Sequence, residues 1–210
     1  VNPLLAPFVT DRKVPCFDKI VSSDFSEAFK VALDRAYTEV NAIIECSEEP
    51  SFENTIEPLE SAGELLDTVS TIFFNLNSAC TSPEMQEIAQ QVSPDLTRFS
   101  MYVSMNERLF ERVKRVKERN EGLDLEQAKL LDNTWTMFVR GGSNLEGEAR
   151  KRLQEINERL SLLSLKFSEN SLADTNAFTL NITDEADLSG LPEGVKQAAK
   201  AEAEERGVEG

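Results

Sequence analysis

The sequence contains no histidine. Histidine is the only side chain whose unperturbed pKa places its charge change near neutrality, and it is the commonest metal ligand. The 210 residues therefore hold no Ser-His or Cys-His pair, no histidine-ligated zinc and no imidazole acid or base. Chemistry based on carboxylates or lysine remains open, but no motif indicates it. We expect a helical scaffold with no catalytic, cofactor-binding or metal-binding residue of its own.

Basic residues are scarce. Lys and Arg number 22 against 38 Asp and Glu, which gives a formal net charge of −16. Binding to a phosphate backbone depends on Lys and Arg, so this balance argues against nucleic acid. It also argues against anionic membrane surfaces, and no apolar run approaches the roughly 20 residues of a membrane span. We expect neither nucleic acid nor a membrane as a partner.

Cysteine is also scarce. Cys16, Cys46 and Cys80 lie far apart, in no CxxC or other ligand spacing. We interpret them as buried or half-buried apolar side chains with free thiols, which favours a reducing compartment and hence the cytoplasm. No signal peptide is recognisable, but the chain begins with Val1. The alternative is a periplasmic protein whose signal was removed.

Helical periodicity covers most of the chain. Apolar residues recur at steps of three and four, and caps, prolines or glycines punctuate the stretches. The pattern predicts a mainly α fold, a multi-helix bundle with one long helix. The predicted helices span about 24–45, 54–77, 82–103, 107–119, 124–140, 145–174 and 192–206. Three prolines make residues 1–22 an extended arm.

Four local signals refine these boundaries. A capping box at Asn54 would start the second helix, and Gly63 inside that helix either permits a close contact or weakens it. Pro94 is expected to kink or split the third helix. A second capping box at Ser143 would start the sixth helix.

The sixth predicted helix is the longest, at about 45 Å. Its apolar seam steps by four and three residues, as in a coiled coil. Further leucines add a second apolar face to its C-terminal half, so we expect that half to be covered on two sides. The seam is Ala149, Leu153, Ile156, Leu160, Leu163 and Phe167, and the added leucines are Leu162, Leu165 and Leu172.

The period changes after this helix. Phe178, Leu180 and Ile182 alternate with polar residues over 177–183, which predicts a half-buried strand. A lone strand leaves its backbone groups unpaired, so we expect its partner in a chain that continues, in the N-terminal arm or in a second copy. The predicted domains are an arm (1–22), a helical bundle (23–175) and a β-α element (176–210) cut before its partner strand.

Several short segments, in this order, resemble a known family. They are Asn2-Pro3-Leu4-Leu5, Pro15-Cys16-Phe17-Asp18-Lys19-Ile20, Ser51-Phe52-Glu53-Asn54-Thr55-Ile56, Phe74-Asn75-Leu76-Asn77-Ser78-Ala79 and Thr183-Asp184-Glu185-Ala186-Asp187-Leu188-Ser189-Gly190-Leu191-Pro192-Glu193. The chain resembles the N-terminal part of bacterial peptidyl-dipeptidases and oligopeptidase A, relatives of thimet oligopeptidase. The resemblance covers all 210 residues, but only the front portion of a family member.

The resemblance implies a large helical zinc peptidase whose two halves enclose a channel. Its zinc site, an HExxH helix with a further carboxylate ligand, belongs to the C-terminal half, so no site residue carries over to this chain. Zinc is expected in the full-length parent and not in these residues. The implied partners are short peptide substrates and the C-terminal catalytic half.

Two main functions remain open, and a catalytically dead member of the family is a weaker third option. The first is the non-catalytic N-terminal helical domain of a zinc metallopeptidase that hydrolyses short peptides, of the peptidyl-dipeptidase type, forming part of the substrate channel wall. The second is a free-standing helical adaptor or peptide-binding module without catalysis. It rests on the absence of chemistry and on the two apolar faces of the long helix.

Overall fold

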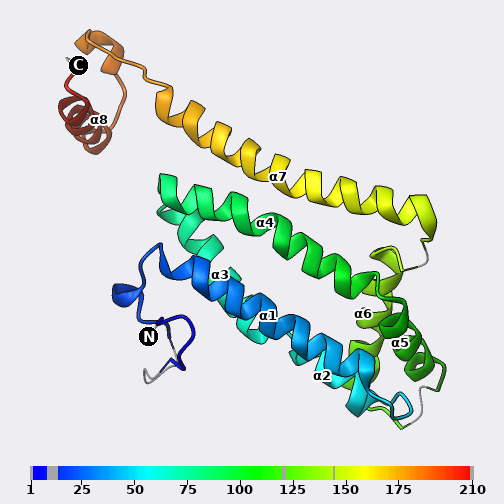
Figure 1. Ribbon diagram of the computed structural model, residues 1–210. Helices are drawn as coiled ribbons and strands as arrows, with labels where there is room; N and C mark the ends of the chain where they lie inside the picture. Colours follow the sequence, from blue (N-terminus) through cyan, green and yellow to red (C-terminus); the bar gives the residue numbers. More distant parts are fainter. Residues whose placement is uncertain (1, 9–13, 120–121, 144, 209–210) are drawn as a thin grey trace. The chain divides into compact units, whose positions relative to one another are not determined.

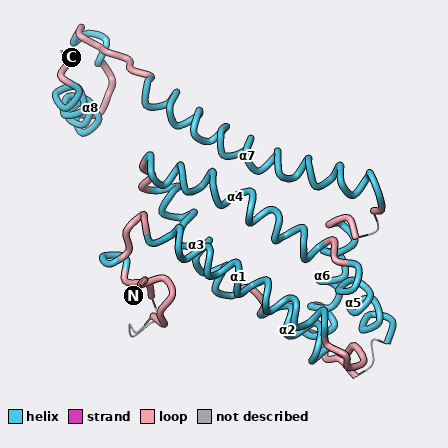
Figure 2. The backbone as a smooth tube through the Cα atoms, in the orientation of Figure 1, coloured by secondary structure: helices cyan, strands magenta, loops and turns pink. Residues whose placement is uncertain are grey.

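The structure is a computed structural model that describes residues 2–8, 14–119, 122–143 and 145–208. All regular structure within these ranges is helical, and no strand occurs among them (Figures 1 and 2). The predicted mainly α bundle is therefore confirmed, and the strand predicted over residues 177–183 is wrong. The chain divides into two compact units, Val1–Lys166 and Phe167–Gly210.

The first unit begins with a core between three helices. Helix α1 (Asp24–Glu45) packs against α3 (Glu64–Ala79) and α4 (Pro83–Ser104), and the three lie side by side (Figure 1). The Phe73 ring lies edge-on to Phe25 and Phe29, with centroids 5.0 and 5.3 Å away. Burying each such ring contributes about 1.5–3 kcal/mol. The core comprises Leu4, Phe25, Ala28, Phe29, Ala32, Ala36, Leu66, Val69, Ile72, Phe73, Met85, Ile88, Ala89 and Val92.

A second core fills the other end of α1. The π-helical turn η2 (Phe52–Ile56), the short α2 (Glu57–Ser61), α5 (Glu107–Arg119) and α6 (Leu125–Arg140) gather there (Figure 2). The indole of Trp135 stacks on the Phe110 ring with centroids 5.1 Å apart. The buried residues are Val40, Ile43, Ile44, Phe52, Ile56, Leu109, Val113, Val116, Leu131 and Phe138.

The N-terminal segment is fastened to the first core. Leu4 is buried there, and the Asn2 side chain donates a hydrogen bond to the Asp24 carbonyl at 2.8 Å. A short 3-10 turn, η1 (Phe17–Lys19), precedes α1, and the Phe17 ring is exposed. Residues 9–13 of the predicted arm lie outside the described residues.

The predicted helix 54–77 is interrupted. Ser51, and not Asn54, is the cap: its hydroxyl accepts from the Asn54 N–H, and the Asn54 side chain accepts from the Ser51 N–H. Helix α2 then ends, and Gly63 adopts φ +84° before α3 starts. The Gly63 N–H donates to Glu39 Oε2 of α1 at 2.8 Å. The break therefore depends on a contact with another helix, which local sequence does not reveal.

Pro94 does not split its helix. Helix α4 is capped by Ser82, the first residue of the predicted helix, whose hydroxyl accepts from the Met85 N–H, and it continues through Pro94 to Ser104. Packing of α4 against α1 supports the helix on both sides of the proline, which lacks an N–H to donate.

The turn before the long helix differs from the predicted capping box. Helix α7 (Gly147–Ala177) starts two residues later than expected, and the Ser143 hydroxyl donates to the Ser104 carbonyl of α4. Gly142 has φ +93°, and a Cβ there would lie 2.7 Å from Leu153 Cδ2. A tertiary contact therefore occupies the Ser143 hydroxyl, and the left-handed backbone at residue 142 favours glycine.

The second unit contains the predicted strand segment. Residues 178–184 form neither strand nor helix, and η3 (Glu185–Leu188) and α8 (Glu193–Arg206) follow. A strand requires a hydrogen-bonded neighbour, and the described chain has no other extended ladder to pair with. Helix α8 forms as predicted and ends at Gly207, whose φ is +67°.

Candidate functional surfaces

Groups able to hold a metal do not converge in the described part of the chain. No three His, Cys, Asp or Glu residues come together there in an arrangement suited to a metal ion. The three cysteines are free thiols: Cys16 and Cys46 are half-buried, within the prediction of buried or half-buried side chains, whereas Cys80 is exposed, contrary to it. Among the described helices, none combines the length and apolarity needed to cross a membrane.

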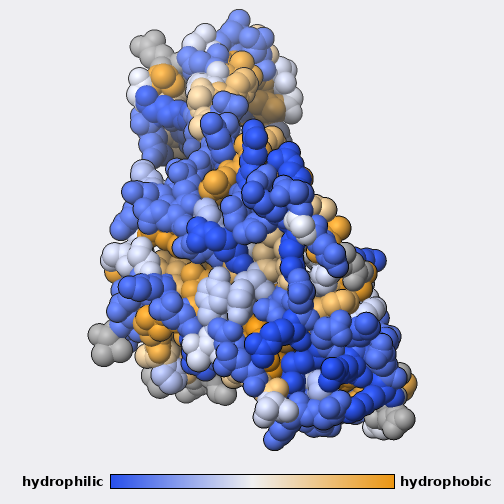
Figure 3. Space-filling model, turned by 45° about the vertical axis from the view of Figure 1, so that its right-hand side comes forward, coloured by the Kyte–Doolittle hydropathy of each residue, from blue (hydrophilic) through white to orange (hydrophobic). Residues whose placement is uncertain are grey.

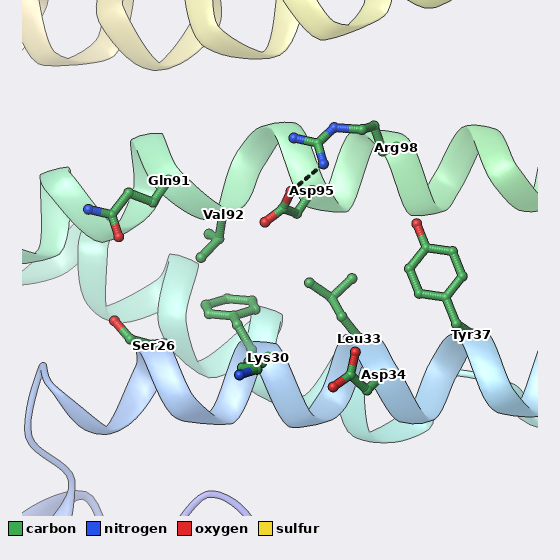
Figure 4. A pocket seen from close by; sticks show the side chains of 10 residues that line it. Ser26, Lys30, Leu33, Asp34, Tyr37, Gln91, Val92, Asp95 and Arg98 are labelled. Carbon is green, nitrogen blue, oxygen red and sulfur yellow. Dashed lines mark ion pairs between the residues drawn. The ribbon is translucent and has the colours of Figure 1, made fainter.

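A cleft of about 410 Å³ lies between α1 and α4. Its lining includes Lys30, Asp34 and Tyr37 on α1 and Asp95 and Arg98 on α4, and the Tyr37 side chain points toward α4 (Figure 4). The Asp95 carboxylate pairs with the Arg98 guanidinium at 2.7 Å. The cleft is thus lined by charges of both signs, and two of them neutralise each other.

Tyr37 is the titratable group of this cleft with a displaced pKa. Burial raises the pKa of its phenol, the Arg98 charge lowers it, and the Asp95 charge raises it again. The ring contacts Phe99 and Tyr102 edge-on at 5.0 Å. Since the net shift is upward from 10.0, the phenol stays protonated at neutral pH. It is therefore a poor general base.

The basic residues of α5 make contacts within the protein. Arg108 donates to the Ile44 carbonyl at 3.1 Å, and Arg119 pairs with Glu49 at 2.5 Å. Lys117 pairs with Asp132, and its hydrogen bond and charge lower the pKa of that carboxyl. These contacts, rather than an external ligand, account for the basic stretch.

Arg112 joins three segments of the first unit. Nη1 donates to the carbonyls of Cys46 and Glu48 at 2.7 and 3.3 Å, and Nη2 donates to Asn54 Oδ1 and Thr55 Oγ1 at 2.9 and 3.2 Å. The side chain is buried, and its Nε has no partner among the described residues. Arg112 thus fixes η2 and the preceding loop against α5.

Arg112 was not singled out from the sequence. It lies within a locally basic stretch, residues 108–119, which is too short and too isolated in an acidic chain to indicate a nucleic-acid patch. The available signal was spacing, because Leu109, Arg112, Val113 and Val116 share the buried face of α5. A lone cation on an apolar stripe predicts a buried hydrogen-bonding role.

The apolar seam of α7 is largely uncovered. Ile156, Leu160 and Leu163 are 45%, 57% and 51% exposed, and Phe167 is 75% exposed. Leu165 packs against the first core. The expected cover on two sides is therefore not provided by the described residues. Figure 3 shows apolar patches among hydrophilic areas on one face of the molecule.

A groove of about 400 Å³ lies within the second unit, between residues 178–182 and α8. Phe178 and Leu180 line it and are 73% and 72% exposed. Arg206 Nη1 donates to Thr179 Oγ1 across it at 3.1 Å. The apolar residues of the segment that was predicted to be a strand thus line one wall of an open groove.

Comparison with known protein families finds a match to most of the first unit. The family model described as neurolysin/thimet oligopeptidase, N-terminal domain, matches residues 29–150. This is more than half of the 210 residues and includes the second core and most of the first. The chain belongs to the thimet oligopeptidase family. The resemblance drawn from short segments is confirmed.

Curated relatives in this family match along the whole chain. Oligopeptidase A of Escherichia coli (strain K12) is 33% identical over 211 residues, covering 100% of this chain and 30% of the relative. Dipeptidyl carboxypeptidase of the same strain is 31% identical, covering 100% and 31%. Dipeptidyl carboxypeptidase of Salmonella typhimurium is 34% identical, covering 99% and 31%. The chain thus spans about a third of the length of these members of the thimet oligopeptidase family.

Proposed function

We propose that this chain is the N-terminal domain of a longer peptidase that hydrolyses short peptides. The observation that carries the proposal is the match of the whole chain to about 30% of oligopeptidase A and dipeptidyl carboxypeptidase. Both names denote enzymes that cleave peptides. The 210 residues offer no histidine and no activated nucleophile, so the reacting groups would lie elsewhere in the parent.

In this proposal the domain is non-catalytic and forms part of the wall of the substrate channel. Two packed cores and the Arg112 contacts supply a rigid helical support. A rigid wall would admit short peptides and exclude folded proteins. The arm (1–22), the bundle (23–175) and the segment 176–210 would be parts of one N-terminal domain.

The residues present do not fit a zinc site. The chain has no histidine, and its described acidic and thiol groups do not cluster around a common point. We therefore place the zinc of the parent outside these 210 residues. When bound, zinc lowers the pKa of its water and polarises a carbonyl group.

The finer choice of activity is peptidyl-dipeptidase, which releases dipeptides from the C-terminal end. Sequence identity alone does not distinguish dipeptide release from internal cleavage. The chain is about equally identical to oligopeptidase A (33%) and to dipeptidyl carboxypeptidase (31%). Mass spectrometry of the products from two hexapeptides, one with a blocked and one with a free C-terminus, distinguishes dipeptide release from internal cleavage. Release of dipeptides that requires a free C-terminus supports our choice, and internal cleavage of the blocked peptide contradicts it.

The proposed compartment is the cytoplasm, because the three cysteines are free thiols. Compartment varies among relatives. Two Arabidopsis thaliana proteins, each 28% identical, are named probable cytosolic oligopeptidase A and organellar oligopeptidase A, chloroplastic/mitochondrial. Fractionation of the source cells, followed by immunoblotting with an antibody against residues 1–210, tests the proposal.

The proposal is tested on the protein as it occurs in the source cells, captured with that antibody and called the native protein below. Its intact mass should be about three times 23.5 kDa, and it should hydrolyse a short fluorogenic peptide but not a folded protein. A chelator should abolish hydrolysis, and added zinc should restore it. The 210-residue chain alone is the control and should be inactive. A native mass of 23.5 kDa would refute the proposal and favour the non-catalytic adaptor.

A further inference from the structure

The groove of the second unit has strongly apolar walls. Its apolar lining comes from the segment before η3, from η3 and its following turn, and from α8 and its end. These residues are Phe178, Leu180, Ile182, Leu188, Leu191, Ala199, Ala203 and Val208. Such exposure of large side chains within one small unit is typical of a binding surface.

Charge is distributed unevenly around this groove. Residues 167–210 contain ten acidic and three basic side chains, yet all three basic ones, Lys196, Lys200 and Arg206, line the groove. Of the nine acidic residues that the structure describes in this unit, only Glu202 lines the groove. The unit is therefore acidic outside and cationic at the groove.

One of these three basic side chains makes no ion pair with a described residue. Lys196 pairs with Glu193 at 3.3 Å, and Arg206 pairs with Glu202 at 2.6 Å, each within α8. Lys200 lies between them in sequence and makes no ion pair with any described residue. An ammonium group beside an apolar wall favours an occupant that brings both apolar side chains and carboxylates.

We propose that this groove binds an apolar polypeptide segment carrying Asp or Glu side chains, supplied by the part of the parent peptidase outside residues 1–210. The inference rests on the proposed function, which provides that further polypeptide. The five residues 178–182 reach at most roughly 17 Å, so the occupant is a segment of about five extended residues. Its carboxylates pair with Lys200 first, because Lys196 and Arg206 already have partners.

Lysine acetylation compares the groove in two proteins. The native protein and the 210-residue chain are treated briefly with an acetylating reagent, and each lysine is quantified by mass spectrometry. We expect acetylation of Lys200 and Lys196 to fall at least ten-fold in the native protein. Lys19 and Lys114, which belong to the first unit, normalise the two samples. Equal reactivity of Lys200 in both proteins would overturn the proposal.

Carbodiimide crosslinking then identifies the occupant, because it joins an ammonium group to a carboxylate in direct contact. In the native protein we expect Lys200 to be linked to an Asp or Glu outside residues 1–210 of the same polypeptide. Lys200→Gln should remove that link and leave the Lys196–Glu193 link intact. Links from Lys200 only to Glu202, to a second copy or to an added free peptide would each contradict the proposal.

Peptide hydrolysis by the same native preparation separates the two levels of the argument. If the native protein is long and active but Lys200 is unprotected, the groove assignment fails and the proposed function stands. If the native mass is that of the 210-residue chain, the proposed function fails first.

Discussion

Two phenylalanines show how the two parts of this molecule differ. Phe73 in the first unit is fully buried and touches three other rings, whereas Phe167 at the start of the second unit is 75% exposed. The two cores of the first unit bury the apolar faces of α1, α3, α4 and α5 within the chain. The seam of α7 and the groove of the second unit present theirs outward. The same residue type thus forms core in one region and a binding surface in the other.

The sharpest test of this difference is to truncate both phenylalanines. Phe73→Ala should lower the free energy of unfolding by about 3–5 kcal/mol, because it leaves a cavity in the core. Phe167→Ala in the 210-residue chain should change it by no more than about 0.5 kcal/mol. Urea unfolding followed by fluorescence of Trp135, the single tryptophan, measures both. Equal losses of unfolding free energy from the two substitutions would contradict the distinction between the two regions.

A second test concerns the buried cation that organises the first unit. Arg112→Met should cost roughly 2–3 kcal/mol, because buried acceptors around η2 lose their donor. Arg115→Met is the matched control on the same helix, since Arg115 is exposed and 3.9 Å from Glu49. It should cost less than about 1 kcal/mol. If both variants unfold alike, Arg112 has no special role in holding η2.

The break between α2 and α3 offers a smaller effect. Gly63→Ala should cost about 1–2 kcal/mol, because φ +84° is strained for any residue with a Cβ. Space is not the cause, since an added Cβ would lie at an ordinary 3.7 Å from Ala36 Cβ. Thermal unfolding of the variant measures the change. A gain in stability would mean that the two helices merge without loss, as the periodicity predicts.

The smallest effect depends on pH and involves the Glu39 contact at the same break. Burial raises the pKa of Glu39, but hydrogen bonds from the Gly63 N–H and Arg35 outweigh it and bring the pKa below 4.5. A lowered folded-state pKa stabilises the protein above the unfolded-state value and ceases to do so as pH falls through the folded-state value. Glu39→Gln should therefore cost less than about 1 kcal/mol at pH 7, and the cost should vanish well below pH 4.5. A constant difference between pH 7 and pH 3 would exclude this ionic contribution.

Local sequence signals predicted the first unit well. The bounds of α1 and α5 agree with the periodicity, and the helices predicted from residues 82 and 124 are capped by Ser82 and Asp124. These signals succeed because side chain and backbone lie within one turn of each other. The break at Gly63 was missed because its hydrogen-bond partner, Glu39, is 24 residues away.

The second unit was predicted less well, and for a different reason. Alternation in residues 177–183 correctly indicated a row of apolar side chains, but a strand also needs a neighbour that the described chain lacks. The seam of α7, most of which lies in the first unit, likewise indicated an apolar face without indicating what covers it. Periodicity shows which residues form an apolar face, and not whether the same chain buries that face. Family membership was reached from short ordered segments, and no site residue was expected in this chain.

The most direct test of the account is hydroxyl-radical footprinting of three phenylalanines in the 210-residue chain and in the native protein. Phe73 should be protected in both proteins. Phe167 and Phe178 should be oxidised readily in the 210-residue chain and strongly protected in the native protein. If Phe167 and Phe178 react equally in both, these surfaces stay open in the parent, and the claim that the outward apolar faces meet the rest of a peptidase is contradicted.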